Sequence, residues 1–367
     1  MKCPHCLADL KYRDRRDGKC PQCQSPFALE PRDNALEMSD LRLRGLAERL
    51  SNQGKHQYTA TQLGYAAVRN KIKQETEKQL SVRTQIILIG IMGIVSVALF
   101  FFESLRWCSG VLFILIIGLG ISAAMQYLQS QKPPLERFQK VLEGFEEQFV
   151  VPWEGIHGAL PGRVTAQEAT ALRRFQLPPA QVRAVLASPV ADVLDCLRAN
   201  GLQQRLGLAL INPDQPASAD EAIIALLRSR PRLPLLLVHD ASVSGCLLPA
   251  LLPARWGLAP NHRIIDLGLR PHHVQQARLP WKREAPPREL LRLLERRTQM
   301  PNGLALTPEE CEWLRRGYVT SALFIPPAPL VTVVTQVVER LAPARVVDPE
   351  AQAQAQARAV GFMTWPS

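Results

Sequence analysis

Two long apolar runs dominate the hydrophobic pattern of this chain. Residues 86–102 and 111–128 contain no charged side chain, and a short linker that includes Glu103 and Arg106 separates them. A helix that crosses a bilayer needs about 20 apolar residues, range roughly 17 to 25. The pattern therefore predicts a two-helix transmembrane hairpin over 86–128.

Basic residues stand on the outer side of both runs. The linker between the runs carries only Arg106, whereas the flanks carry Lys71, Lys73, Lys78 and Arg83 on one side and Lys132, Arg137 and Lys140 on the other. Loops rich in Lys and Arg stay in the cytoplasm, and basic flanks are attracted to anionic lipid. We expect a bacterial inner (cytoplasmic) membrane protein with both termini cytoplasmic and membrane lipid as one partner.

Helical periodicity dominates the segments on both sides of the hairpin. Leucines recur at helical spacing over 40–50, and 65–80 is polar, which together indicate a helical connector over 31–85. After the hairpin, apolar residues form a helical stripe over 135–151, and 164–174 and 178–200 read as further helices. The sequence thus predicts a helical region over 129–205.

The pattern changes at about residue 206. Short apolar runs at 206–211, 233–238 and 264–269 alternate with helical segments at 220–228 and 246–252. Such alternation is typical of an α/β fold with a parallel sheet. We expect a Rossmann-like α/β domain over 206–345, followed by a low-complexity flexible tail over 346–367.

Charge adds little to this picture. The net charge is +11, from 44 Lys and Arg against 33 Asp and Glu. The nearest approach to a nucleic-acid footprint is Arg288, Arg292 and Arg296, spaced four apart on one expected helix. Glu289 and Glu295 lie among them, so a solvated helix face is favoured and nucleic acid stays an alternative partner.

The strongest chemical motif lies in the first 23 residues. Cys3-Pro-His-Cys6 and Cys20-Pro-Gln-Cys23 are two Cys-x-x-Cys pairs with thirteen residues between them. Two such pairs supply the four thiolates that a tetrahedral zinc ion needs, and four protein ligands leave no open position for substrate. Residues 1–30 resemble the zinc-ribbon family, and we expect a structural Zn²⁺ site at Cys3, Cys6, Cys20 and Cys23.

A second set of candidate ligands follows the apolar run at 233–238. Asp240, Ser242 and Ser244 form an Asp-x-Ser-x-Ser motif, and Asp266 ends the next apolar run. The motif resembles the metal-ion-dependent adhesion site of von Willebrand factor A domains, where the Asp and both Ser hold magnesium. The resemblance implies a Mg²⁺ site with Asp240 as anchor and Ser242 and Ser244 as hydroxyl ligands. Asp266 is expected at the same edge of the sheet as a supporting carboxylate, because ligands collect outside the carboxyl ends of parallel strands. A helix cap at Asp240 or Ser242 is the alternative.

The same region, 235–271, also resembles the Toprim segment of topoisomerase VI A-type proteins, through His239-Asp240 and the later stretch Gly268-Leu-Arg-Pro271. That family needs a second Asp at the position of Ser242 and a glutamate after the preceding strand, which is absent here. The missing carboxylates argue against nuclease or topoisomerase chemistry.

Other reactive residue types are scattered. Cys196, Cys246 and Cys311 lie in apolar helical stretches, and His272-His273 lacks a partnering nucleophile or third ligand. The sequence therefore predicts a binding or regulatory protein that holds a protein partner. The alternatives are a divalent-metal-dependent binder or enzyme that uses Asp240, and a nucleic-acid-binding protein.

Overall fold

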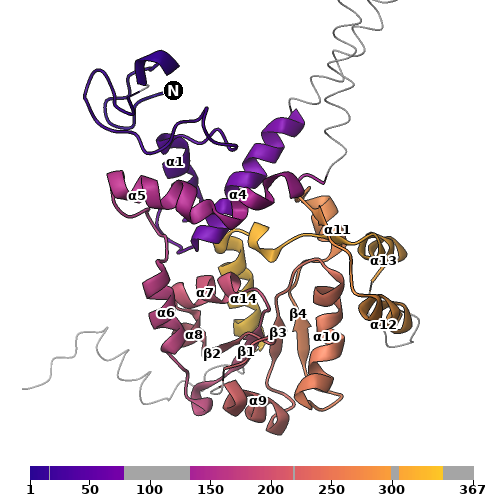
Figure 1. Cartoon of the computed structure of the whole chain (residues 1–367). Helices are drawn as coiled ribbons and strands as arrows, with labels where there is room; N and C mark the ends of the chain where they lie inside the picture. The colour runs from indigo at the N-terminus through magenta and orange to yellow at the C-terminus, as the bar shows by residue number, and fades with distance from the viewer. Residues whose placement is uncertain (16, 78–132, 218–219, 299–305, 342–367) are drawn as a thin grey trace, which may run out of the picture.

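A parallel sheet forms the centre of the computed structural model, which describes residues 1–15, 17–77, 133–217, 220–298 and 306–341 (Figure 1). The strand order is β2-β1-β3-β4, so the chain runs from the inner strand β1 outward to β2 and then back across to β3. Leu186 of β1 lies opposite Leu210 on one side and Leu236 on the other. The strands are β1 (Ala184–Ala187), β2 (Leu208–Ile211), β3 (Leu235–Leu237) and β4 (Ile264–Asp266).

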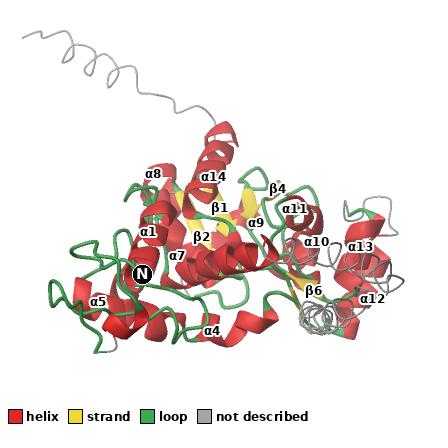
Figure 2. Ribbon diagram, turned by 90° about the horizontal axis from the view of Figure 1, so that it is seen from above, coloured by secondary structure: helices red, strands yellow, loops and turns green. Residues whose placement is uncertain are grey.

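Successive side chains of these strands enter two different hydrophobic cores. Leu186 and Leu236 belong to the larger core, which also contains apolar residues of α7, α8, α14 and the helix over 60–77. Val185 and Leu235 belong to the smaller core, with α9 and the end of α10. Because both faces are covered, the strands are apolar except for Asp266 at the end of β4, as expected of a parallel sheet. Figure 2 shows the helices surrounding the sheet.

Helices are the commonest elements of the described chain. Their bounds are α1 (Asp40–Leu50), 60–77, α4 (Gln139–Glu143), α5 (Val151–His157), α6 (Ala166–Arg174), α7 (Ala191–Ala199), α8 (Leu202–Leu206), α9 (Asp220–Ser229), α10 (Val243–Trp256), α11 (Pro271–Gln276), α12 (Arg288–Thr298), α13 (Pro308–Arg315) and α14 (Pro327–Leu341). A two-stranded antiparallel pair, β5 (Lys282–Arg283) with β6 (Tyr318–Val319), completes the fold.

The transmembrane hairpin in the predicted fold class needs correction. None of the helices that the structure describes is both long and apolar enough to cross a membrane. The two apolar runs themselves, 86–102 and 111–128, lie outside the described residues, as does the tail over 346–367. The fold class is accordingly an α/β unit with an N-terminal cysteine cluster, and the inner-membrane location, which rested on the hairpin, is withdrawn.

The physical reason lies in what the sequence pattern measures. Run length and hydropathy report how apolar a segment is and leave open what it packs against. The flanking charges also have roles inside the fold: the Lys71 ammonium is buried and lies 2.7 Å from Glu37, and Arg137 lies 3.1 Å from Glu75. Both were counted as basic flanks of the hairpin, yet each has an acidic partner of its own.

The sheet also begins earlier in the chain than the pattern indicates. β1 lies inside 178–200, which we expected to be helical, and it is an inner strand. Its sequence Ala-Val-Leu-Ala is short and half alanine, so neither periodicity nor β-propensity separates it from the following helix. The stripe over 135–151 is likewise interrupted, because a π-helical turn over Glu146–Val150 lies between α4 and α5.

Candidate metal centre and strand ends

Four cysteines converge near the N-terminus. The Sγ atoms of Cys3, Cys6, Cys20 and Cys23 all lie within 4.8 Å of one another. The Sγ atoms of Cys3 and Cys23 are 3.7 Å apart, and those of Cys6 and Cys20 are 3.6 Å apart. A tetrahedron with metal–sulfur bonds of about 2.3 Å has edges of about 3.8 Å. The cluster therefore has the size and the ligands to hold a metal ion.

The two Cys-x-x-Cys turns repeat the same backbone geometry. In the first turn, the Leu7 N–H donates to the Cys3 carbonyl, and the Cys3 N–H donates to the Ala8 carbonyl. In the second turn, the Gln24 N–H donates to the Cys20 carbonyl, and the Cys20 N–H donates to the Ser25 carbonyl. Leu7 and Gln24, each directly after the second cysteine, both have positive φ, 60° and 58°. This matched turn directs both thiols of each pair toward a common centre.

The thiols of the cluster have strongly different acidities. Hydrogen bonds from Ser25 lower the pKa of the Cys23 thiol to about 6. The backbone hydrogen bond with Ala8 acts to lower the pKa of the Cys6 thiol, but partial desolvation and hydrogen bonds with the three neighbouring sulfur atoms raise this pKa to about 12. Thiols bind a metal as thiolates, and the positive charge of a metal ion held here would offset the repulsion between them.

The metal centre is tied to the helices by buried polar contacts. The Asp40 carboxylate, at the start of α1, accepts hydrogen bonds from the backbone N–H groups of Ala28 and Leu29 at 3.0 and 2.8 Å. Its Oδ2 also lies 2.8 Å from Nε2 of His157 at the end of α5. Asp40 is 1% exposed, so these three contacts fix the cysteine segment on α1 and α5.

Asp240, the anchor of the expected magnesium site, has protein partners. Its Oδ1 accepts hydrogen bonds from the Ala322 backbone N–H at 2.6 Å and from the Ser321 hydroxyl at 3.2 Å. Burial raises the pKa of the Asp240 carboxyl, although these two hydrogen bonds act to lower it. The segment that follows β6 thus lies across the end of β3, where Ala241 also pairs with Thr320.

The two serines of the motif lie at the start of α10. Ser242 is the helix cap, and its Oγ accepts from the Gly245 N–H at 3.0 Å. Its Oγ also lies 3.1 Å from that of the exposed Ser244. The cap expected as the alternative role of Ser242 is therefore present.

Asp266, at the end of β4, faces basic groups. Its Oδ1 lies 3.0 Å from Nε2 of His239, and its Oδ2 accepts from Nη2 of Arg270 at 3.0 Å. Burial acts to raise the pKa of Asp266, but the hydrogen bonds from His239, Gly268 and Arg270 outweigh it and hold the pKa well below its usual range. In the described part of the chain, only the cysteine cluster brings three or more metal-ligating side chains together. The divalent-ion site at Asp240, Ser242, Ser244 and Asp266 stays a prediction.

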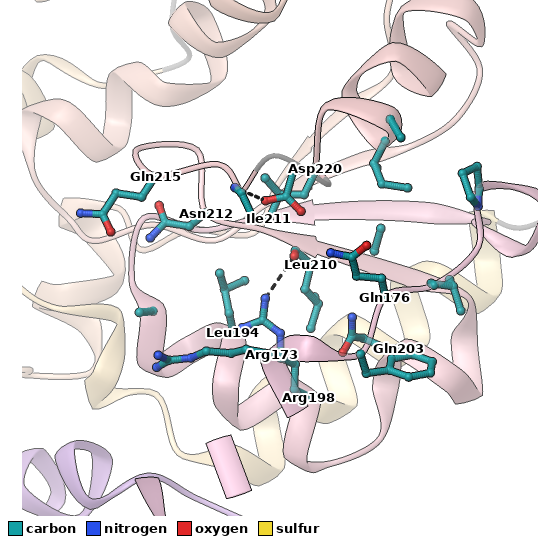
Figure 3. A pocket seen from close by; sticks show the side chains of 18 residues that line it. Arg173, Gln176, Leu194, Arg198, Gln203, Leu210, Ile211, Asn212, Gln215 and Asp220 are labelled. Atoms are coloured by element: carbon teal, nitrogen blue, oxygen red, sulfur yellow. Dashed lines mark hydrogen bonds between the residues drawn. The ribbon is translucent and has the colours of Figure 1, made fainter. Parts of the chain in front are cut away.

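Sequence reasoning missed a polar cavity of about 310 Å³ on the outer strand β2 (Figure 3). Arg198 of α7 donates from Nη2 to the carbonyl of Leu210 at 3.2 Å and from Nη1 to Asp195 at 3.0 Å. Gln203 of α8 lines the same cavity and is only 5% exposed. These residues come from separate elements without a shared motif, so no sequence signal marks the cavity.

Comparison of the chain with protein-family models, curated proteins and solved structures gave no match.

Proposed function

We propose that this chain is a binding or regulatory protein, in which a structural zinc ion orders the N-terminal segment, and this segment together with α5 forms the surface that holds a protein partner. The observation that carries the proposal is the convergence of four cysteine Sγ atoms within 4.8 Å. Zinc is the ion that such an all-sulfur tetrahedral set binds in structural sites. Four protein ligands leave no position for a substrate, so the centre serves structure rather than catalysis.

Residues beside the metal centre support the binding role. Leu7, at the tip of the first cysteine turn, is 63% exposed, and Val151 and Ile156 of α5 are 57% and 39% exposed. His5 lies two residues before Leu7, and His157 directly follows Ile156. The centroids of the two imidazole rings are 5.5 Å apart. Exposed apolar side chains near one another are a common mark of protein interaction sites. The zinc ion would hold Leu7 in place beside α5.

Metal analysis tests the zinc centre. The purified protein should contain one zinc ion per chain, and Cys20→Ser should lose it because three thiolates bind far more weakly than four. Cys311→Ser is the matched control, since it removes a buried thiol of α13 and leaves the cluster intact. A zinc-free wild type, or equal zinc in both variants, would overturn the assignment.

Pull-down with paired variants tests the binding surface. A tagged wild type should retain a reproducible partner that Leu7→Glu and Ile156→Glu lose. Val333→Glu is the matched control, because Val333 is 44% exposed on α14, a different helix. A partner that all three variants retain would exclude this surface, and the absence of any reproducible partner would count against the binding role.

A further inference from the structure

A second cavity, of about 570 Å³, lies where four segments distant in the sequence meet. Its walls come from α1, the helix over 60–77, the loop after α11 and the loop before α14. The volume is within the range of about 300 to 1,000 Å³ typical of small-molecule sites. No role assigned above to the metal centre or the strand ends uses this cavity.

The interior of the cavity is apolar. Leu46, Leu50 and Ile72 line it, as do Leu323 and Phe324, and all five are buried. The Phe324 ring packs edge-on against Tyr65 with centroids 4.9 Å apart, which fixes one wall. Such a surface favours an alkyl or aryl group by removing it from water.

The lining also carries an excess of positive charge. Arg49, Arg69, Lys73 and Arg278 line the cavity, against one acidic residue, Glu77. Within the described ranges, none of these four cations forms an ion pair with a carboxylate. Their side chains are exposed or half-buried and are therefore accessible to a ligand. Four cations around one apolar cavity attract an anion.

The buried polar residue of the lining, Gln62, interacts with the protein itself. Gln62 is 1% exposed, and its Oε1 accepts from the Thr59 N–H at 3.1 Å. Its side chain also interacts with the Cys196 thiol of α7, where it acts to lower the pKa of that group. The apolar walls and the four cations, rather than Gln62, therefore define the site.

From these features we infer that the cavity is a binding site for a small amphipathic anion, a molecule with an alkyl or aryl body and a carboxylate or phosphate head. The apolar walls select the body, and the four cations select the head. A neutral alcohol of equal length would leave the cations without a counter-charge, and a short anion such as acetate would leave the walls uncovered.

Calorimetry with decanoate below its micelle concentration tests the site on the full-length protein. Decanoate should bind once per chain, more tightly than decanol or acetate, and less tightly at high salt because ions screen exposed charges. Arg69→Gln combined with Arg278→Gln should weaken decanoate binding by about tenfold or more, which is about 1.4 kcal/mol. Ala277→Trp, which adds bulk at an exposed lining position, should also weaken it.

The matched control removes two positive charges elsewhere. Arg230 and Arg232 are exposed in the turn after α9, which lies at the opposite end of the molecule from α1 (Figure 1). Arg230→Gln with Arg232→Gln should leave decanoate binding unchanged. No binding of decanoate, equal binding of decanol, or equal affinity in the two double variants would overturn the inference. Weaker binding in Ala277→Trp with unchanged binding in the Arg69→Gln, Arg278→Gln variant would also overturn it, because the cavity would then bind an apolar group without selecting an anion.

Discussion

The imidazole of His239 links the ends of two neighbouring strands: its Nε2 lies 3.0 Å from Oδ1 of Asp266, and its Nδ1 lies 2.9 Å from the backbone carbonyl of Asp240. Each ring nitrogen therefore faces an oxygen atom of a different strand end. His239 is fully buried, so these two contacts fix the orientation of its ring. The pair joins β4 to the end of β3.

Two glycines pack against this imidazole. A Cβ added to Gly268 would lie 2.3 Å from two atoms of the His239 ring, and one added to Gly245 would lie 2.2 Å from the Asp240 carbonyl oxygen. Gly268→Ala should therefore displace the ring and destabilise the protein by roughly 1–3 kcal/mol. Urea unfolding of the variant and wild type measures the difference.

Gly155→Ala provides the control for that measurement. Gly155 lies in α5, and a Cβ there meets nothing within 4 Å. Alanine favours a helix over glycine by about 1 kcal/mol, so this variant should be as stable as wild type or more stable. Equal stability of Gly268→Ala and wild type would show that the ring has room to move.

The acidity of Asp266 predicts a specific pH dependence. Its pKa is lower in the folded than in the unfolded chain, so the unfolded chain takes up the proton first as the pH falls. Its contribution to stability is complete above the unfolded value of about 3.9 and is lost as the pH falls toward the folded value. Asp266→Asn should cost roughly 1.5–3 kcal/mol near neutral pH, because it removes the charged acceptor that faces His239, Gly268 and Arg270, and the cost should shrink in acid.

Asp220 tests the sign of this argument. Burial raises its pKa, so its ionised form is disfavoured in the folded state. Asp220→Asn should be neutral or stabilising near neutral pH, and its difference from wild type should shrink as acid protonates Asp220. Unfolding curves between about pH 2 and 7 compare the two variants, and a cost of Asp266→Asn that stays constant as the pH falls below about 3.9 would contradict the assignment.

Local chemistry made much of the α/β unit predictable. The run at 206–211 contains β2, and α13 begins with a local signal in which Thr307 and Glu310 form a capping box and Pro308 takes the first helical position. Helix caps and apolar runs depend on residues close in sequence, which is why they can be read directly. The convergence of Cys3, Cys6, Cys20 and Cys23 was predictable for the same reason, because each turn is encoded within a few residues.

Long-range packing made the rest unpredictable. The partners of Asp240 are Ser321 and Ala322, about eighty positions later in the chain, and no local pattern announces them. The cavity lined by Arg69 and Arg278 likewise depends on the meeting of distant segments. The hairpin prediction relied partly on basic flanking residues such as Lys71. In the fold, Lys71 pairs with Glu37 of another segment, which hydropathy and local charge do not indicate.

Asp40 should decide how firmly the cysteine segment is held. Asp40→Ala removes the acceptor of the Ala28 and Leu29 N–H groups and the partner of His157. Hydrogen bonds to charged groups contribute about 1.5–3 kcal/mol each, so the segment should open locally and amide exchange at Ala28 and Leu29 should accelerate. Asp9→Ala is the control, because the Asp9 side chain is 86% exposed. Zinc content equal to wild type in Asp40→Ala would show that the metal site forms independently of its attachment.

Magnesium titration separates the two roles open to Asp240. If the strand ends bind a divalent ion, calorimetry with Mg²⁺ or Mn²⁺ should give a binding signal in wild type that Asp240→Ala loses. If Asp240 is structural instead, its hydrogen bonds with Ser321 and Ala322 predict a loss of stability. Asp240→Ala should lower the free energy of unfolding by about 1–3 kcal/mol, because the buried Ala322 N–H loses its acceptor. Asp240→Asn keeps a carbonyl oxygen at this position and should lower it less. Equal stability of Asp240→Ala and wild type would exclude the structural role, and ion binding that is unchanged in Asp240→Ala would exclude Asp240 as the anchor. Stability and ion binding are measured separately on wild type, Asp240→Ala and Asp240→Asn, so the result for one role does not depend on the result for the other.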